Sequence, residues 1–192
     1  MEDELSALFS KFPSLKKEEI KAISENIIVR SLKKGTILLN EGSISKECYS
    51  VLKGCVRKYY IKDGEEKTTA FFTEGEAVAS FSSYINETPS KHYLVCAEDC
   101  SLTVGTKEKD AEMCLKFPIL ESIIRSEMEK NAGKAQEEHS LFIISSPEER
   151  YLNLLENKPH LLNRVPQHQI ASYLGIKPES LSRIRKRIVS KS

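Results

Sequence analysis

The sequence predicts an α+β protein in which an antiparallel β-roll is followed by a long helix and then by two short helices. Three observations support this fold. Between Ile28 and Thr106, short runs of β-branched and aromatic residues alternate with glycines, which is typical of a compact antiparallel barrel or roll. Residues 107–145 return to helical spacing, and residues 167–188 contain two helical patterns separated by Gly175.

Local patterns predict where several elements begin and end. Apolar residues at helical spacing predict helices within residues 1–27, with a break at Pro13 and a new helix start at Ser14. The stretch KDGEEK around Gly64 predicts a hairpin turn. In the stretch SSPEER, Ser146 is the expected N-cap of a further helix, since a proline and a glutamate follow at the positions that such a start favours.

A roughly heptad-like stripe marks the long helix. It consists of Leu120, Ile124, Met128, Asn131, Ala135 and Phe142. A stripe of this kind packs either on the chain's own roll or on the same helix of a second copy. The period of the pattern does not choose between these two alternatives.

The last two predicted helices have one apolar side. That side consists of Ile170, Ala171, Leu174, Leu181, Ile184 and Ile188. Gly175 stands where the chain must reverse, and Pro178 stands at the first position of the second helix, where its missing N–H costs nothing. The pattern is typical of a helix-turn-helix that lays its second helix in the DNA major groove. An ordinary helical hairpin with a solvated, charged face is the alternative.

Charge is distributed unevenly along the 192 residues, whose net charge is +1. From residue 157 onward there are eight basic residues and one acidic residue, a net charge of +7, so residues 1–156 carry −6. A basic tail behind an acidic body is typical of a nucleic-acid-binding protein.

Other classes of protein are disfavoured by what the sequence contains. No apolar run is long enough to span a membrane and the start, MEDELSALF, is unlike a secretory signal, so we expect a cytoplasmic protein. Its five cysteines are then expected to be reduced and mostly buried, and the spacing of Cys96 and Cys100 does not suggest a metal or iron–sulfur site. An enzyme on a cupin-like roll is the least favoured hypothesis, because the four histidines are scattered and no nucleophile motif appears.

The order of roll, long helix and helix-turn-helix resembles the Crp–Fnr superfamily of bacterial transcription regulators. The resemblance covers nearly the whole chain and lies in two segments, LKKGTILLNEGSISKECYSVLKGCVRKYYIKDGEEKTTAFFTEGEA and IASYLGIKPESLSRIRKRI, the second of which is especially similar to short Crp-type regulators of the Bacteroidetes group. It implies a cyclic-nucleotide-binding-domain-like roll over residues 1–116, a dimerisation helix over 117–145 and a winged-helix-like helix-turn-helix domain over 146–192. The implied partners are double-stranded DNA with a near-palindromic site, a second copy of the chain, RNA polymerase as a further candidate, and an unknown small-molecule effector.

The resemblance also places the base-reading positions, at Pro178, Glu179 and Arg183. Because proline has no polar side chain for a base hydrogen bond, Glu179 and Arg183 are the expected base readers: arginine binds guanine in bidentate fashion, and glutamate accepts from cytosine. Further contacts with DNA, mainly with its backbone, are expected from Gln167, His168, Ser180, Ser182 and Lys186.

Cyclic-nucleotide sensors of the superfamily hold the ribose with a Gly-Glu pair and the cyclic phosphate with an arginine followed by serine or threonine. This chain has Gly75 and Glu76, but the matching second half offers Ser90 and Lys91 and no arginine. Lysine supplies a point charge rather than a planar fork, so cyclic-nucleotide binding is disfavoured and no cofactor is assigned. A receptor module that binds a cyclic nucleotide in the roll is the alternative to a DNA-binding regulator.

Overall fold

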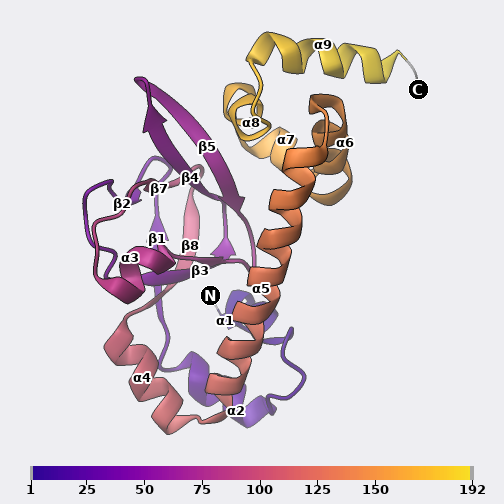
Figure 1. Cartoon of the computed structure of the whole chain (residues 1–192). Helices are drawn as coiled ribbons and strands as arrows, with labels where there is room; N and C mark the ends of the chain where they lie inside the picture. The colour runs from indigo at the N-terminus through magenta and orange to yellow at the C-terminus, as the bar shows by residue number, and fades with distance from the viewer. Residues whose placement is uncertain (1, 191–192) are drawn as a thin grey trace.

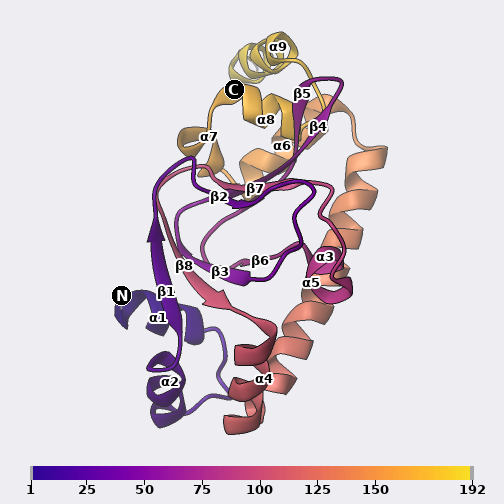
Figure 2. The ribbon, with the colours of Figure 1, turned by 90° about the vertical axis from the view of Figure 1, so that its left-hand side faces the viewer.

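The computed structural model describes residues 2–190, which form a β-roll, a long helix beside it and a helical lobe at the C-terminal end (Figure 1). This is the α+β fold that the sequence predicts. Figure 2 shows the two sheets of the roll facing each other. The strands are β1 (Ile28–Leu32), β2 (Ile37–Leu39), β3 (Cys48–Lys53), β4 (Val56–Lys62), β5 (Glu65–Phe72), β6 (Ala77–Val78), β7 (Tyr93–Cys96) and β8 (Cys100–Gly105).

Each sheet has four antiparallel strands, in the orders β1-β8-β3-β6 and β2-β7-β4-β5. The predicted hairpin at Gly64 is confirmed, since Lys62 of β4 pairs with Glu65 of β5. The helix α3 (Phe81–Asn86) lies where the sequence suggested only strands and turns, and the strand β6 has only two residues. Both are too short for a periodic pattern to appear in the sequence.

The N-terminal helices are α1 (Glu2–Phe9) and α2 (Lys17–Ser24). The prediction of a helix start at Ser14 is wrong by three residues, because α2 begins at Lys17. The carboxylate of Glu19 accepts the N–H of Lys16 at 2.8 Å. The backbone N–H that precedes α2 therefore has an acceptor without a serine cap.

The long helix α5 (Ile119–Ile144) follows α4 (Lys107–Lys116) and runs beside the roll (Figure 1). Only its first turns pack on the chain's own core, where Leu120 is buried and Ile119 and Ile123 are partly buried beside α1 and α2. Every residue from Met128 to Ile144 is exposed. The apolar stripe is therefore buried in the same chain only at its beginning, although the Phe142 ring near its end lies against Arg150.

The C-terminal lobe contains α6 (Pro147–Asn157), α7 (Leu161–Arg164), α8 (Gln167–Tyr173) and α9 (Pro178–Val189). The predicted cap at Ser146 is confirmed: its hydroxyl accepts the Glu149 N–H, and the Glu149 carboxylate accepts the Ser146 N–H. Among the described residues no strand follows β8, so the lobe has no β-wing and the winged part of the expectation is not met. The chain between α5 and α8 is helical because its apolar residues recur at helical rather than alternating spacing.

One hydrophobic core joins the lobe to the roll. Phe71, Cys55 and Ala97 of the roll belong to the same buried cluster as Leu154 and Leu161 of the lobe. Phe71 also meets Tyr173 edge to face, with ring centroids 5.4 Å apart. Within residues 2–190, no helix combines the length and the apolar character that crossing a bilayer requires.

Replacing Leu161 tests this shared core. Leu161 is fully buried, so Leu161→Ala is expected to lower the free energy of unfolding by about 2–4 kcal/mol, through lost burial and the cavity left behind. Urea denaturation followed by circular dichroism measures the change. The control is Leu115→Ala, where the side chain is 84% exposed and the expected change is below about 0.5 kcal/mol. Equal effects of the two substitutions would contradict a core that joins the lobe to the roll.

Candidate functional site

The turn between α8 and α9 is built around Gly175. Its φ is +70°, a conformation that favours glycine, and a Cβ there would also make tight contacts of 3.1 Å with Arg150 Nη1 and Phe142 Cζ. Arg150 donates to the carbonyl of Leu174 at 2.8 Å and lies over the Phe142 ring, 4.1 Å from its centroid. The end of α8 is thereby fixed to the ends of α5 and α6.

The packing of α9 determines which of its residues face outward. Leu181 and Ile184 are buried against the lobe, and Ile188 packs partly buried at the edge of the same cluster. Pro178 occupies the first turn of the helix, as its sequence position predicts. In Figure 1, α9 lies at the end of the molecule farthest from α1 and α2.

The residues expected to contact DNA lie on the outer surface. Glu179 and Arg183 are both exposed, and the Arg183 guanidinium donates a 3.4 Å hydrogen bond to Ser180 Oγ. Ser180 is partly buried. The other expected contacts are all exposed: Gln167, His168, Ser182 and Lys186.

Three basic residues of the C-terminal segment form ion pairs with carboxylates of the same chain. Arg187 of α9 pairs with Glu148 of α6 at 2.8 Å. Lys158 and Arg164 pair with carboxylates of the roll. From the sequence, these three residues were expected to contribute to a basic surface for nucleic acid. In the structure, Arg187 links two helices of the lobe, and Lys158 and Arg164 link the lobe to the roll.

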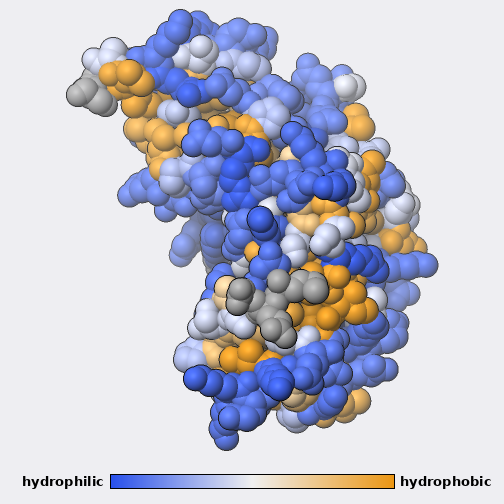
Figure 3. Space-filling view, turned by 180° about the vertical axis from the view of Figure 1, so that it is seen from behind, coloured by the Kyte–Doolittle hydropathy of each residue, from blue (hydrophilic) through white to orange (hydrophobic). Residues whose placement is uncertain are grey.

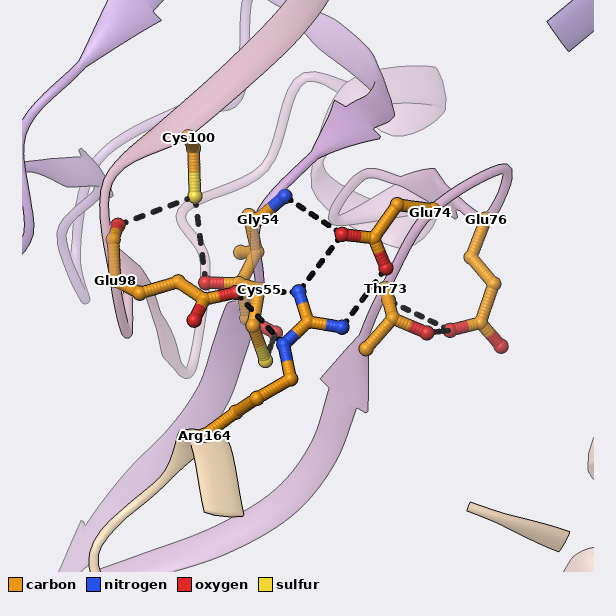
Figure 4. A network of polar contacts seen from close by, with 9 residues as sticks. Gly54, Cys55, Thr73, Glu74, Glu76, Glu98, Cys100 and Arg164 are labelled. Carbon is orange, nitrogen blue, oxygen red and sulfur yellow. Dashed lines mark hydrogen bonds and ion pairs between the residues drawn. The ribbon is translucent and has the colours of Figure 1, made fainter. Parts of the chain in front are cut away.

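Arg164 is the centre of the polar junction between lobe and roll (Figure 4). Its guanidinium donates to both carboxylate oxygens of Glu74, at 2.9 and 2.8 Å, and its Nε donates to Glu98 at 3.0 Å. The Gly54 N–H donates to the same Glu74 carboxylate at 2.9 Å. Partial burial disfavours the charge of Glu74, but the hydrogen bonds from Arg164 and the Gly54 N–H outweigh it and lower its pKa to about 2.

An open cavity of about 460 Å³ lies at this junction. Seen from behind, the surface of the molecule is mostly hydrophilic, with hydrophobic patches among the hydrophilic residues (Figure 3). The lining of the cavity carries both signs of charge: Lys53, Gly54, Glu74, Glu98, Asp99 and Arg164. Because the carboxylates already bind Arg164, the cavity is the docking seam rather than a site with free ligand groups.

Glu76, the expected ribose ligand, is also engaged at the seam. Its carboxylate accepts the Thr73 N–H at 2.7 Å and ion-pairs with Lys134 of α5 and with Lys158, both at 3.3 Å. Burial opposes the charge of Glu76, but Lys158 and the Thr73 N–H more than compensate, and its pKa is lowered.

The other expected ligand groups, Gly75, Ser90 and Lys91, have surroundings of their own. Ser90 is buried and its hydroxyl donates to the carbonyl of His92 at 2.9 Å, while Lys91 is exposed. The ammonium of Lys11 lies against Gly75, where a Cβ would be 1.7 Å from it. Among residues 2–190 no hydrogen bond or ion pair links Gly75 or Glu76 to Ser90 or Lys91.

The cysteines are all free in the described part of the chain. Cys55, Cys96 and Cys100 are buried, whereas Cys48 and Cys114 are partly exposed. Burial raises the pKa of Cys55 to about 12, so its thiol stays protonated. Residues 2–190 hold no group of three or more His, Cys, Asp or Glu side chains arranged to bind a metal ion.

Comparison with known families matches residues 29–116 to the cyclic nucleotide-binding domain. The chain is 21% identical to the catabolite activator protein of Thermus thermophilus, with a TM-score of 0.57 over 96% of this chain and 87% of that one. It is 20% identical to FixK2 of Bradyrhizobium japonicum, with a TM-score of 0.67 over 86% and 85% of the two chains. It is 17% identical to CLP of Xanthomonas campestris, described as a c-di-GMP-responsive global regulator. The TM-score of that match is 0.67, over 89% of this chain and 92% of that one.

No curated protein matches the sequence significantly. At these identities the structural matches establish a shared fold: a β-roll of the cyclic nucleotide-binding type followed by helices, as in Crp–Fnr-type regulators.

The seam predicts a specific dependence of stability on pH. The folded-state pKa of Glu74, about 2, lies below that of an unfolded glutamate, about 4.3, so its stabilising effect is complete above the unfolded value and is lost as pH falls from about 4.3 toward 2. Glu74→Gln is expected to lower the free energy of unfolding at pH 7 by about 1 kcal/mol, because the pair is partly exposed. It should also flatten the dependence below pH 4.3.

Urea unfolding at several pH values measures both effects. The matched control is Glu112→Gln, which alters an exposed glutamate on α4, away from the seam. If the free energy of unfolding of Glu74→Gln falls below pH 4.3 as steeply as that of the wild type, the Arg164 contact does not stabilise the fold.

Proposed function

We propose that the protein is a sequence-specific, DNA-binding transcription regulator of Crp–Fnr type, bacterial and cytoplasmic, in which α8 and α9 form the helix-turn-helix. The observation that supports this most is the division of α9 into two faces. Leu181 and Ile184 are buried, whereas Glu179, Arg183 and Lys186 are exposed at the far end of the molecule. A helix held in this way presents hydrogen-bonding side chains to base edges without rearrangement of its core.

A homodimer joined along α5 is part of the proposal. The helix has 26 residues, and every residue from Met128 to Ile144 is exposed. Apolar side chains of the stripe face solvent in both halves of the helix, since Ile124 is 43%, Met128 45% and Phe142 42% exposed. Burial of this stripe against a second copy would remove apolar area from water, and two-fold symmetry would place two copies of α9 on the two halves of a near-palindromic site.

The effector of this regulator is not a cyclic nucleotide in our proposal. Glu76 already binds Lys134 and Lys158, and the segment expected to hold the phosphate offers Ser90 and Lys91 but no arginine. The proposed relationship to the short Bacteroidetes-type members and the proposed contact with RNA polymerase depend on the sequence resemblance alone.

A cyclic-nucleotide-responsive receptor module is the second candidate. It is supported by the family match over residues 29–116 and by the Gly75–Glu76 pair. Calorimetry with a panel of cyclic nucleotides separates the candidates, since saturable binding would favour the receptor and its loss in Glu76→Gln would place the ligand at this pair.

Arg183 and Lys186 should have different effects on DNA binding. Arg183→Ala is expected to weaken binding to the selected site by about 1–3 kcal/mol and to abolish discrimination at one base pair, because a bidentate base contact is lost. Lys186→Ala should weaken specific and random duplexes alike and reduce the salt dependence, because it removes a phosphate contact. Fluorescence anisotropy on both duplexes measures the effects. Equal losses on both duplexes for Arg183→Ala would reduce Arg183 to a phosphate contact.

A charge on the α5 stripe should separate the proposed dimer. Met128→Asp places two carboxylates near the two-fold axis and is expected to raise the dimer dissociation constant by about 100-fold, because like charges would meet in an apolar contact. Light scattering after size-exclusion chromatography measures the mass. The control is Ser126→Asp, which adds the same charge on another face of α5. A wild-type protein that stays monomeric at micromolar concentration, or a Met128→Asp variant that remains a dimer, would refute this interface.

A further inference from the structure

A second polar cluster lies inside the roll, on the face of β4 and β7 that points toward the opposite sheet. Val56, Leu94 and Cys96 of these strands belong to the core between the sheets. Lys58 pairs directly with Leu94, so its side chain points to that same face. Two residues further on, Tyr60 and His92 continue the two strands, and their rings lie 5.3 Å apart.

Lys58 has no counter-charge. Its side chain is partly buried, and in residues 2–190 it makes no hydrogen bond and no ion pair; its ammonium lies 5.8 Å from the centroid of the Tyr60 ring. Burial lowers the pKa of Lys58, without any carboxylate to raise it. A half-buried cation without a partner is unusual in proteins, because desolvation of its charge is normally offset by an opposite charge.

His92 adds an unsatisfied polar atom beside Lys58. It is 7% exposed, and its Nε2 is fully buried with no hydrogen-bond partner among the described residues. Burial and the nearby charge of Lys58 lower the pKa of His92 to about 4, so the ring is neutral at pH 7 and can donate from Nε2. Ser90 fixes this segment, since its hydroxyl donates to the His92 carbonyl and accepts the His92 N–H at 3.2 Å.

We propose that Lys58, Tyr60 and His92 form a binding site for a small oxyanion, a carboxylate or a phosphate group, inside the roll. Lys58 supplies the positive charge, and the buried His92 Nε2–H supplies a hydrogen bond. No acidic residue forms an ion pair with the cluster among residues 2–190. The Tyr60 ring borders both groups and would limit the size of the bound anion.

This site is separate from the Gly75–Glu76 turn, where Glu76 is engaged by two lysines. The opposite face of β4 and β5 carries Arg57 and Phe71, and the Thr68 N–H of β5 donates to Ser172 Oγ of α8 at 2.9 Å. An anion bound on the inner face would therefore contact strands on which the C-terminal lobe is docked. That role as an effector site rests on the proposed function, whereas the anion site itself does not.

The test uses the full chain without DNA, so its failure is distinct from a failure of the proposed function. Backbone amide resonances are followed by NMR during titration with inorganic phosphate and, separately, with acetate, at constant ionic strength in chloride. We expect saturable shifts at residues 58–60 and 92–94 with at least one of the two anions. In Lys58→Met the affinity should fall by at least about tenfold, because a charge-assisted contact is lost. In Lys62→Met, an exposed lysine of the same strand, it should be unchanged.

His92→Phe provides an independent variant, because it keeps a ring beside Tyr60 and removes the nitrogen; it should also weaken binding. Thermal melts establish that each variant is folded. The absence of saturable shifts with both anions in the wild-type chain, or affinity retained in both Lys58→Met and His92→Phe, would overturn the proposal.

Discussion

The burial of Leu181 and Ile184 against the lobe decides which face of α9 meets solvent. Each of these side chains is worth roughly 1.5–3 kcal/mol when removed from water, which is more than any of the exposed polar contacts on the helix. With them fixed, helical geometry places Glu179, Arg183 and Lys186 on the outer side. The turn at Gly175 and the Arg150 hydrogen bond to Leu174 then hold this face in a defined orientation.

The same chain has a second constraint in the seam between the lobe and the roll. Phe71 and Leu161 share a hydrophobic core, and Arg164 and Lys158 bind carboxylates on either side of Gly75. The Gly75–Glu76 turn, which the sequence resemblance assigned to a ribose, is here part of the docking surface. A ligand that recruited Glu76 would have to compete with Lys158, so occupancy of the turn and docking of the lobe are coupled.

The fold and the helix pair could be predicted from the sequence because they depend on local patterns. Glycine-punctuated strands, the Ser146 cap and the apolar side of α8 and α9 are each visible within a few residues. The seam could not be predicted, because Arg164 and Glu74 are 90 residues apart and meet only through the docking of two domains. Their charges look in sequence like part of a basic tail and an acidic body.

The cluster of Lys58, Tyr60 and His92 could not be predicted from the sequence for a related reason. Those residues come together through strand register, and an error of one residue would put Lys58 on the outer face. The sequence instead drew attention to Ser90 and Lys91, the neighbours of His92. In the structure Ser90 hydrogen-bonds to the backbone of His92, and Lys91 points to solvent.

Selection of bound sequences from a pool of random duplexes tests the central claim most directly, since it asks whether α9 reads bases in a symmetric pair. The account predicts an enriched inverted repeat with half-sites about 10–10.5 base pairs apart, or a multiple of that spacing, whose binding weakens steeply with added salt. A pool without enrichment, or one enriched in a single unsymmetric motif, would contradict it.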